Sequence, residues 1–262
     1  MKSSIVVLLI QFTSFLVFIG RAYQFFFFET PFHPFLSDES LIIPLCALLL
    51  LLAALTSIFW FNISIKKLRK WFMAIGISVL VLIGLYLVKE KNYDILQFLE
   101  LTIQLASPLS LFFLSKNNHQ NAFKQIFFLK FAIALTFIAH GLFALGIPYL
   151  PGHFIEMTVT ILPITEEQAR QLLFTAGVFD IMASLLLFVP KTGQYALIYM
   201  VIWGCLTALA RVASGIDSQF FIESLHNSAY LTIYRLPHGL LPLAVFVLGV
   251  QRAQVNAAGS RL

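Results

Sequence analysis

Seven ionisable side chains lie within apolar segments of the sequence, where charged residues are rare. They comprise three arginines, two carboxylates and two histidines: Arg21, Arg211, Arg235, Glu100, Asp180, His140 and His238. Placing one charge near the centre of a bilayer costs about 2.5–3.5 kcal/mol on insertion scales, so such residues usually face the interior of a helix bundle. Arginine binds anions well, and histidine exchanges protons near neutral pH. These seven residues are therefore the candidate ligand-binding residues.

Polar residues recur at helical spacing around these candidates. Gln97, Glu100, Gln104 and Ser107 follow the i, i+3, i+7, i+10 pattern that places side chains on one face of a helix. Similar registers join further polar residues: Thr136 with His140, Asp180 with Ser184, Thr207 with Arg211, and Arg235 with His238. Stripes of this kind on several segments predict one shared polar interior.

Other kinds of site chemistry have little support in the sequence. A metal ion needs three or four ligands, usually at short and recognisable spacings. Neither HxxxH nor HExxH occurs, so we predict no metal site. Cys46 and Cys205 lie in apolar runs without a CxxC spacing, which is typical of small buried hydrophobic residues. The sequence indicates no particular cofactor.

The composition places these candidates in a membrane protein. Of the 262 residues, 60% are apolar and only 11% are charged, and the mean hydropathy is +0.90. A soluble domain usually carries roughly 25% charged residues, so a soluble enzyme is excluded. The net charge of +5 does not predict nucleic-acid binding, because the basic residues cluster in the connections between apolar runs.

Eight apolar segments have about the length that a membrane crossing requires. They occupy residues 5–28, 41–61, 71–88, 95–115, 125–147, 170–189, 194–214 and 237–250. We expect the last segment to start near Leu231 and to bend at Pro237. The predicted fold class is an all-α polytopic membrane protein with eight transmembrane helices, which leaves no room for a separate soluble domain.

The charges in the connections predict the orientation of this bundle. Lysine and arginine concentrate on one side when the segments alternate, as in the run from Lys66 to Lys70, whereas the carboxylates of the connections fall on the other side. Basic connections are cytoplasmic, so both termini are expected in the cytoplasm and the protein in the cell (inner) membrane. The connections on the opposite side, 29–40, 148–169 and 215–230, are longer, which favours binding on the extracytoplasmic side. In this topology all candidates except Asp180 lie in the outer half of the membrane.

The two halves of the chain are similar to each other. Residues 18–21 align with residues 137–140, which places Arg21 opposite His140, and SPLSLFFL at 107–114 is similar to LPLAVFVL at 241–248. The second match sets Gln104 opposite His238. Four segments in each half predict a parallel 4+4 repeat, with residues 1–118 and residues 119–262 as two four-helix units of one compact bundle.

The second half also resembles a known family over about residues 125–215. Residues 128–141 are followed by a loop, then by AGVFDIMASLLLFVP at 176–190 and the basic turn at Lys191. This pattern resembles the DoxX-like four-helix membrane modules, and Asp180 occupies the position where those modules commonly have glutamate. The resemblance implies a helical bundle that serves as a partner subunit in quinone- or thiol-linked membrane complexes.

These observations favour a membrane module with a net basic cavity that opens to the extracytoplasmic side. The first functional hypothesis is a non-catalytic partner subunit that binds a quinone, a lipid headgroup or a small anion, with arginines Arg21, Arg211 and Arg235 supplying the positive field. Glu100 and Asp180 would orient the arginines. The expected partners are the lipid bilayer and a second membrane protein.

Three alternatives remain open at this point. An outer-leaflet membrane enzyme would use His140 or His238 as a general base, and it requires a histidine within about 3 Å of a carboxylate. A proton- or ion-coupled carrier would use Asp180. The charged residues could instead form purely structural ion pairs, Arg211 with Asp180 and either Arg21 or Arg235 with Glu100. Whether the protein is catalytic is therefore not determined by the sequence.

Overall fold

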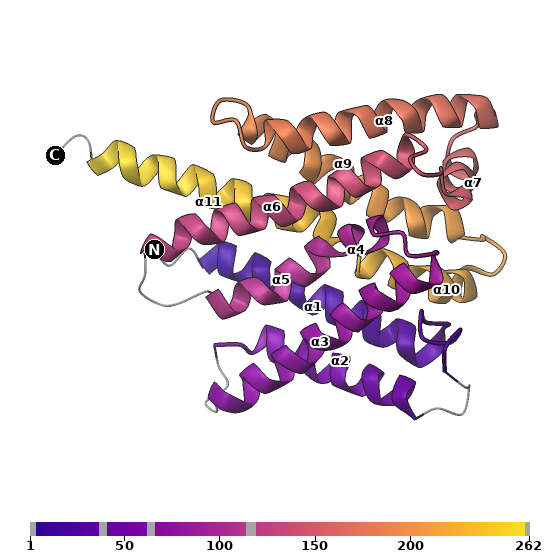
Figure 1. Cartoon of the computed structure of the whole chain (residues 1–262), viewed down its shortest axis with the longest axis horizontal. Coiled ribbons are helices and arrows are strands. Elements are labelled where there is room, and N and C mark those ends of the chain that lie inside the picture. The colour runs from indigo at the N-terminus through magenta and orange to yellow at the C-terminus, as the bar shows by residue number, and fades with distance from the viewer. Residues whose placement is uncertain (1–3, 37–40, 62–65, 114–118, 260–262) are drawn as a thin grey trace.

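The computed structural model describes residues 4–36, 41–61, 66–113 and 119–259, and all regular secondary structure in these residues is helical (Figure 1). The helices are α1 (Ser4–Phe27), α2 (Ile42–Ile58), α3 (Lys66–Glu90), α4 (Leu96–Glu100), α5 (Thr102–Phe113), α6 (His119–Ala144), α7 (Gly152–Ile161), α8 (Glu166–Leu186), α9 (Gly193–Gly215), α10 (Phe221–Ile233) and α11 (Pro237–Gly259). Several residues behind the orientation and domain predictions lie outside the described ranges: Lys2, Asp38, Glu39, Lys116, Arg261 and the boundary at residue 118.

Six helical segments are long and apolar enough to cross a membrane, so the chain is a multi-pass membrane protein by length and composition. Two of them are α8 and α9, three are most of α1, α3 and α6, and the sixth runs over residues 221–251. The other two predicted spans are shorter in the structure. Helix α2 has 17 residues, and the segment predicted as 95–115 is divided into α4 and α5. The number of eight crossings therefore remains a prediction.

The division between α4 and α5 is a correction to the single helix expected over residues 95–115. Thr136 of α6 lies against the break, and its hydroxyl accepts a hydrogen bond from the backbone N–H of Ile103 at 3.1 Å. The hydroxyl groups of Thr136 and Thr102 are 2.9 Å apart. Side-chain hydrogen bonds to the backbone offer an alternative to the regular helical pattern. The helix can break inside the bundle because α6 supplies the polar partner.

The last predicted span also consists of two helices, in agreement with the bend expected at Pro237. Helix α10 ends at Ile233 and α11 begins at Pro237, and proline is favoured as the first residue of a helix because its missing N–H would have no helical partner there. Pro242 lies within the continuous helix α11 and does not interrupt it.

The start of α1 and the end of α11 lie at the same end of the bundle, and the short helices α7 and α10 lie at the opposite end (Figure 1). An even number of crossings requires this arrangement. Helix α10 begins within the predicted connection 215–230 and ends at Ile233. Helix α7 forms within the connection 148–169. Both short helices therefore cover the end of the bundle that the charge pattern assigns to the outside.

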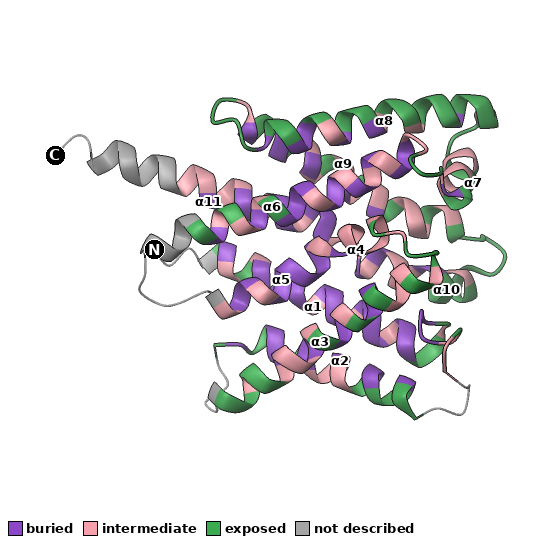
Figure 2. Cartoon of the chain, viewed as in Figure 1, coloured by how far each residue is buried: buried purple, intermediate pink, exposed green. Residues whose placement is uncertain are grey.

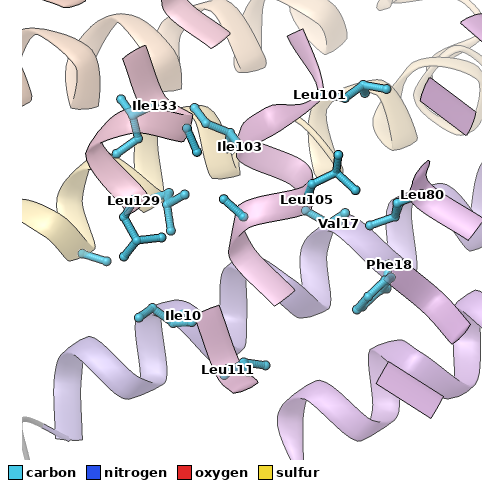
Figure 3. Close-up of a cluster of buried hydrophobic side chains, with 14 of the residues drawn as sticks. Ile10, Val17, Phe18, Leu80, Leu101, Ile103, Leu105, Leu111, Leu129 and Ile133 are labelled. Carbon is cyan, nitrogen blue, oxygen red and sulfur yellow. The ribbon is translucent and has the colours of Figure 1, made fainter. Parts of the chain in front are cut away.

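The hydrophobic core is built mainly from aliphatic and aromatic side chains of α1, α2, α3, α5, α6 and α11. Figure 3 shows part of it, with Phe18 of α1, Leu80 of α3, Ile103 of α5 and Ile133 of α6, all fully or almost fully buried. By contrast, α8 exposes much of its surface (Figure 2), and exposed apolar residues such as Phe179 and Leu185 lie on it. An exposed apolar surface of this extent is typical of contact with lipid.

Candidate ligand-binding site

Arg21 is held in a buried polar cluster that joins α1, α5 and the end of α10. Its Nε and Nη2 donate to Gln104 Oε1 at 3.1 and 2.9 Å, and its Nη1 donates to Gln24 Oε1 at 2.9 Å. The guanidinium lies over the ring of Tyr234, with 3.8 Å between Cζ and the ring centroid. Arg21 is only 4% exposed, so its three hydrogen bonds and the aromatic face replace water around a buried cation.

Arg235 lies next to this cluster and contacts Glu100. One guanidinium nitrogen is 3.5 Å from Glu100 Oε1, a second donates to the hydroxyl of Tyr234, and the group also packs against the Tyr234 ring. Tyr234 therefore lies between two arginines. Of the predicted ion pairs, the one between Arg235 and Glu100 is present.

Glu100 also contacts His140. The atoms His140 Nε2 and Glu100 Oε1 are 3.0 Å apart, which is within ion-pair distance, but they are not aligned for a hydrogen bond. The rings of His140 and His238 are parallel, with their centroids 5.3 Å apart. His238 Nδ1 is 2.7 Å from the carbonyl oxygen of Arg235. A carbonyl can only accept, so Nδ1 carries the proton.

Asp180 is buried on α8 and is partnered by a tyrosine. The hydroxyl of Tyr199 on α9 donates to Asp180 Oδ1 at 2.8 Å. The pairing of Asp180 with Arg211 that the sequence suggested is wrong, because no ion pair joins these two described residues within 4.0 Å. Instead, Arg211 Nη2 is 3.3 Å from His153 Nε2, and its guanidinium lies 5.8 Å from the ring centroid of Phe154. Residues of α7 thus take the place that was expected for the carboxylate.

Two neighbouring pockets collect these side chains. The first, which we call the apolar pocket, is lined mainly by apolar residues of α6, α7, α8 and α9: Phe137, Ala144, Phe154, Met157, Leu173, Ala176, Trp203, Gly204 and Ala208. Its polar lining consists of His140, Asp180, Thr207, Arg211, Arg235 and His238.

The second, the polar pocket, contains Arg21, Glu100, Arg235 and further polar groups, among them Gln24, Lys91, Gln97, Tyr149 and His153. Phe154 and Arg235 line both pockets. The two pockets therefore adjoin at these two residues.

All seven predicted residues line at least one of the two pockets. Arg21 and Glu100 line the polar pocket, Arg235 lines both, and the remaining four line the apolar pocket. Whether these residues bind a ligand remains a prediction. Tyr234 and Tyr199, the partners of the charged groups, were not identified from the sequence. Tyr234 directly precedes Arg235, and Tyr230 lies one helical turn earlier. This spacing is the signal that could have indicated an aromatic partner for the arginine.

No three histidine, cysteine or carboxylate side chains of the described ranges lie together as a metal-binding group. Comparison with known proteins gives no further assignment, since no protein-family model, curated protein or solved structure matches the chain. The DoxX-like resemblance of residues 125–215 therefore remains a prediction.

Proposed function

We propose that the protein is a non-catalytic binding module of the cell membrane, whose adjoining pockets hold a ligand with a polar head and an apolar body. A lipid or a quinone has this build. The observation that carries the proposal is the lining of the apolar pocket, which combines Arg211 and Arg235 with apolar and aromatic side chains. Small-molecule sites are commonly built in this way, from a largely apolar surface with a few placed polar groups.

The adjoining polar pocket supports an amphiphile over a free small anion. A small anion would contact the arginines and leave the apolar lining unused. An amphiphile can occupy both pockets, because Arg235 and Phe154 belong to each. The DoxX-like resemblance adds the proposal that the module works beside a second membrane protein. A carrier using Asp180 has less support, since the only charged or hydroxyl partner of its carboxylate in the described ranges is Tyr199.

The proposed topology has eight crossings, with α2 and the pair α4–α5 as the two that are short in the structure. Contacts within each half support the proposed 4+4 repeat. Arg21 and His140 are equivalent in the repeat alignment, as are Gln104 and His238. Arg21 bonds Gln104, and His140 stacks on His238. The two positions that contact each other in the first half are thus equivalent to the two that contact each other in the second half.

The orientation is testable with single cysteines in sealed cells, after Cys46 and Cys205 have been replaced by alanine. We expect an impermeant maleimide added from outside to label Glu156→Cys on α7, because this exposed residue lies at the end assigned to the outside. Lys67→Cys at the start of α3 should be labelled only after the cells are opened. The reverse pattern would contradict cytoplasmic termini.

The proposed binding function predicts that filling the apolar pocket displaces its ligand. Ala176 of α8 lines this pocket, so Ala176→Phe should remove at least about nine tenths of any lipid or quinone that the wild-type protein retains on purification from native membranes. The loss follows because a phenyl group would occupy the space of the ligand. Mass spectrometry of the extracted lipids and quinones measures it.

Val178→Phe is the matched control, because Val178 lies on the same helix, is 38% exposed and does not line the pocket. This variant should retain the ligand at the wild-type level. Equal retention by both variants would contradict binding in the apolar pocket, and the absence of any enriched molecule in the wild-type preparation would contradict the function as a whole.

An outer-leaflet enzyme is the second candidate function, and one distance favours it. His140 Nε2 lies 3.0 Å from a carboxylate oxygen of Glu100, as a general base oriented by a carboxylate requires. The lipid extraction described above also tests this candidate. An enzyme would generate a chemically altered lipid in membranes with the wild-type protein, and the alteration would be missing with His140→Gln. Identical lipid profiles would exclude catalysis on membrane lipids.

A further inference from the structure

Three buried nitrogen atoms without a hydrogen-bond partner among the described residues belong to residues of the same pocket. They are Arg235 Nε, His140 Nε2 and His238 Nε2, and all three residues line the apolar pocket. A buried polar atom without a partner costs roughly 1–3 kcal/mol, so such atoms are uncommon and ask for an explanation. Their clustering in one pocket indicates a ligand group that supplies the missing hydrogen bonds.

The three nitrogens differ in what they can bind. Arg235 Nε carries a hydrogen and can only donate. His140 Nε2 lies 3.0 Å from the Glu100 carboxylate, which favours a hydrogen on this nitrogen as well. The two groups are not aligned for a hydrogen bond, so this hydrogen is available to a ligand.

His238 has the opposite character. Its Nδ1 hydrogen is directed to the Arg235 carbonyl, and no described carboxylate lies within 4.0 Å of the ring. In the neutral ring Nε2 is therefore an acceptor. A ligand group that satisfies all three nitrogens must accept hydrogen bonds from Arg235 Nε and His140 Nε2 and donate one to His238 Nε2.

The charges around the pocket set the charge of this group. Two arginines, Arg211 and Arg235, line the apolar pocket with one carboxylate, Asp180, so the formal charge of the lining is +1. Adding the neighbouring Arg21 and Glu100 leaves the same surplus. Charges buried away from water need a counter-charge, so a ligand with a single negative charge fits best.

We propose that the apolar pocket binds a singly charged phosphomonoester group, whose P–O–H donates to His238 Nε2 and whose oxygens accept from Arg235 Nε and His140 Nε2. This inference rests on the proposed binding function and names its ligand. A carboxylate has the charge but no hydroxyl hydrogen, a neutral carboxylic acid has the hydrogen but no charge, and a phosphodiester lacks the hydrogen. The apolar lining favours a lipid as the carrier of the group.

The test compares two anionic lipids that differ at the phosphate. The protein is reconstituted in phosphatidylcholine nanodiscs that contain either phosphatidic acid, a phosphomonoester, or phosphatidylmethanol, an anionic phosphodiester whose headgroup has no hydroxyl group, and the lipid that remains bound is measured by native mass spectrometry. We expect about tenfold tighter retention of phosphatidic acid, the effect of one hydrogen bond to a charged group. Inorganic phosphate should not displace it. Displacement by phosphate at equal concentration would support the phosphate chemistry and assign a soluble source.

Two substitutions test the role of His238 in this preference. His238→Asn keeps a donor for the Arg235 carbonyl but has no atom at the Nε2 position, so it should lose the preference about tenfold. His238→Gln, which places an acceptor near the Nε2 position, should keep most of it. Melting temperatures of both variants show whether they are folded, and the lipid comparison in the wild-type protein needs neither variant.

Equal retention of the two lipids by the wild-type protein would overturn the phosphomonoester assignment and leave the binding function intact. An unchanged preference in a folded His238→Asn variant would overturn it as well. Retention of neither lipid, together with equal lipid content in the Ala176→Phe and wild-type preparations, would overturn both proposals.

Discussion

Replacement of Glu100 by alanine should destabilise the protein by about 3–5 kcal/mol, the typical effect of removing one partner of a buried ion pair. Glu100 is the only carboxylate within 4.0 Å of Arg235 among the described residues, and both side chains are less than one fifth exposed. Without Glu100, the Arg235 cation would remain in the bundle with Tyr234 as its main partner. Thermal unfolding in detergent, followed by near-ultraviolet circular dichroism, measures the change.

The exposed pair between Arg170 and Glu166 provides the control. These residues are one helical turn apart on α8, and their side chains are 52% and 63% exposed. Exposed pairs at this spacing contribute about 0.3–0.5 kcal/mol, so Glu166→Ala should melt close to the wild-type temperature. Glu100→Gln retains the shape and an acceptor for Arg235, and it should fall between the two alanine variants. Equal melting of Glu100→Ala and Glu166→Ala would show that the buried pair carries no stability.

Gly204→Ala should destabilise the protein by about 1–3 kcal/mol and displace the wall of the apolar pocket. Helices α9 and α11 approach closely at this position. A β-carbon on Gly204 would clash with the backbone oxygen of His238, and a backbone atom cannot move aside as the end of a flexible side chain can. Close contact through small residues is a common way for membrane helices to pack. The variant should therefore also retain less lipid, because His238 would move with its backbone.

Gly249→Ala on α11 is the control for this substitution. Apart from its chain neighbours and the backbone of its own helix, no heavy atom of the described residues lies within 4 Å of the position of its added β-carbon. Alanine is favoured over glycine within a helix by up to about 1 kcal/mol, so this variant should be as stable as the wild type or slightly more stable. If Gly204→Ala melted at the same temperature as Gly249→Ala, the close contact of α9 with α11 would not be required.

Composition and helical spacing predicted the helices and the region of the candidate site. Apolar runs are strong signals, and the cost of a charge in lipid directed attention to the seven residues that line the two pockets. The break at Leu101 could not be predicted, because its stabilising group, Thr136, is 35 positions away in the chain. Local spacing carries no information about such a partner.

The choice of partners for the charged residues was also beyond the sequence. Charge counting suggested that Arg211 would pair with Asp180, whereas an aromatic hydroxyl, Tyr199, partners the carboxylate. A tyrosine in an apolar run is indistinguishable from a packing residue until the neighbouring helix is placed. Arg211 instead contacts His153 of α7, a helix that lies between two of the predicted crossings. Pairing depends on how the helices are arranged, which charge counting cannot supply.

The break between α4 and α5 is connected through α6 to the charged residues of the candidate site. Thr136, which receives the Ile103 hydrogen bond there, lies one turn before His140 on α6, and Glu100 is the last residue of α4. A shift of α6 along its axis would therefore displace the hydrogen bond between Thr136 and Ile103. The same shift would move His140 relative to the Glu100 carboxylate. A ligand that displaced His140 along the axis of α6 would therefore also change the geometry of the α4–α5 junction.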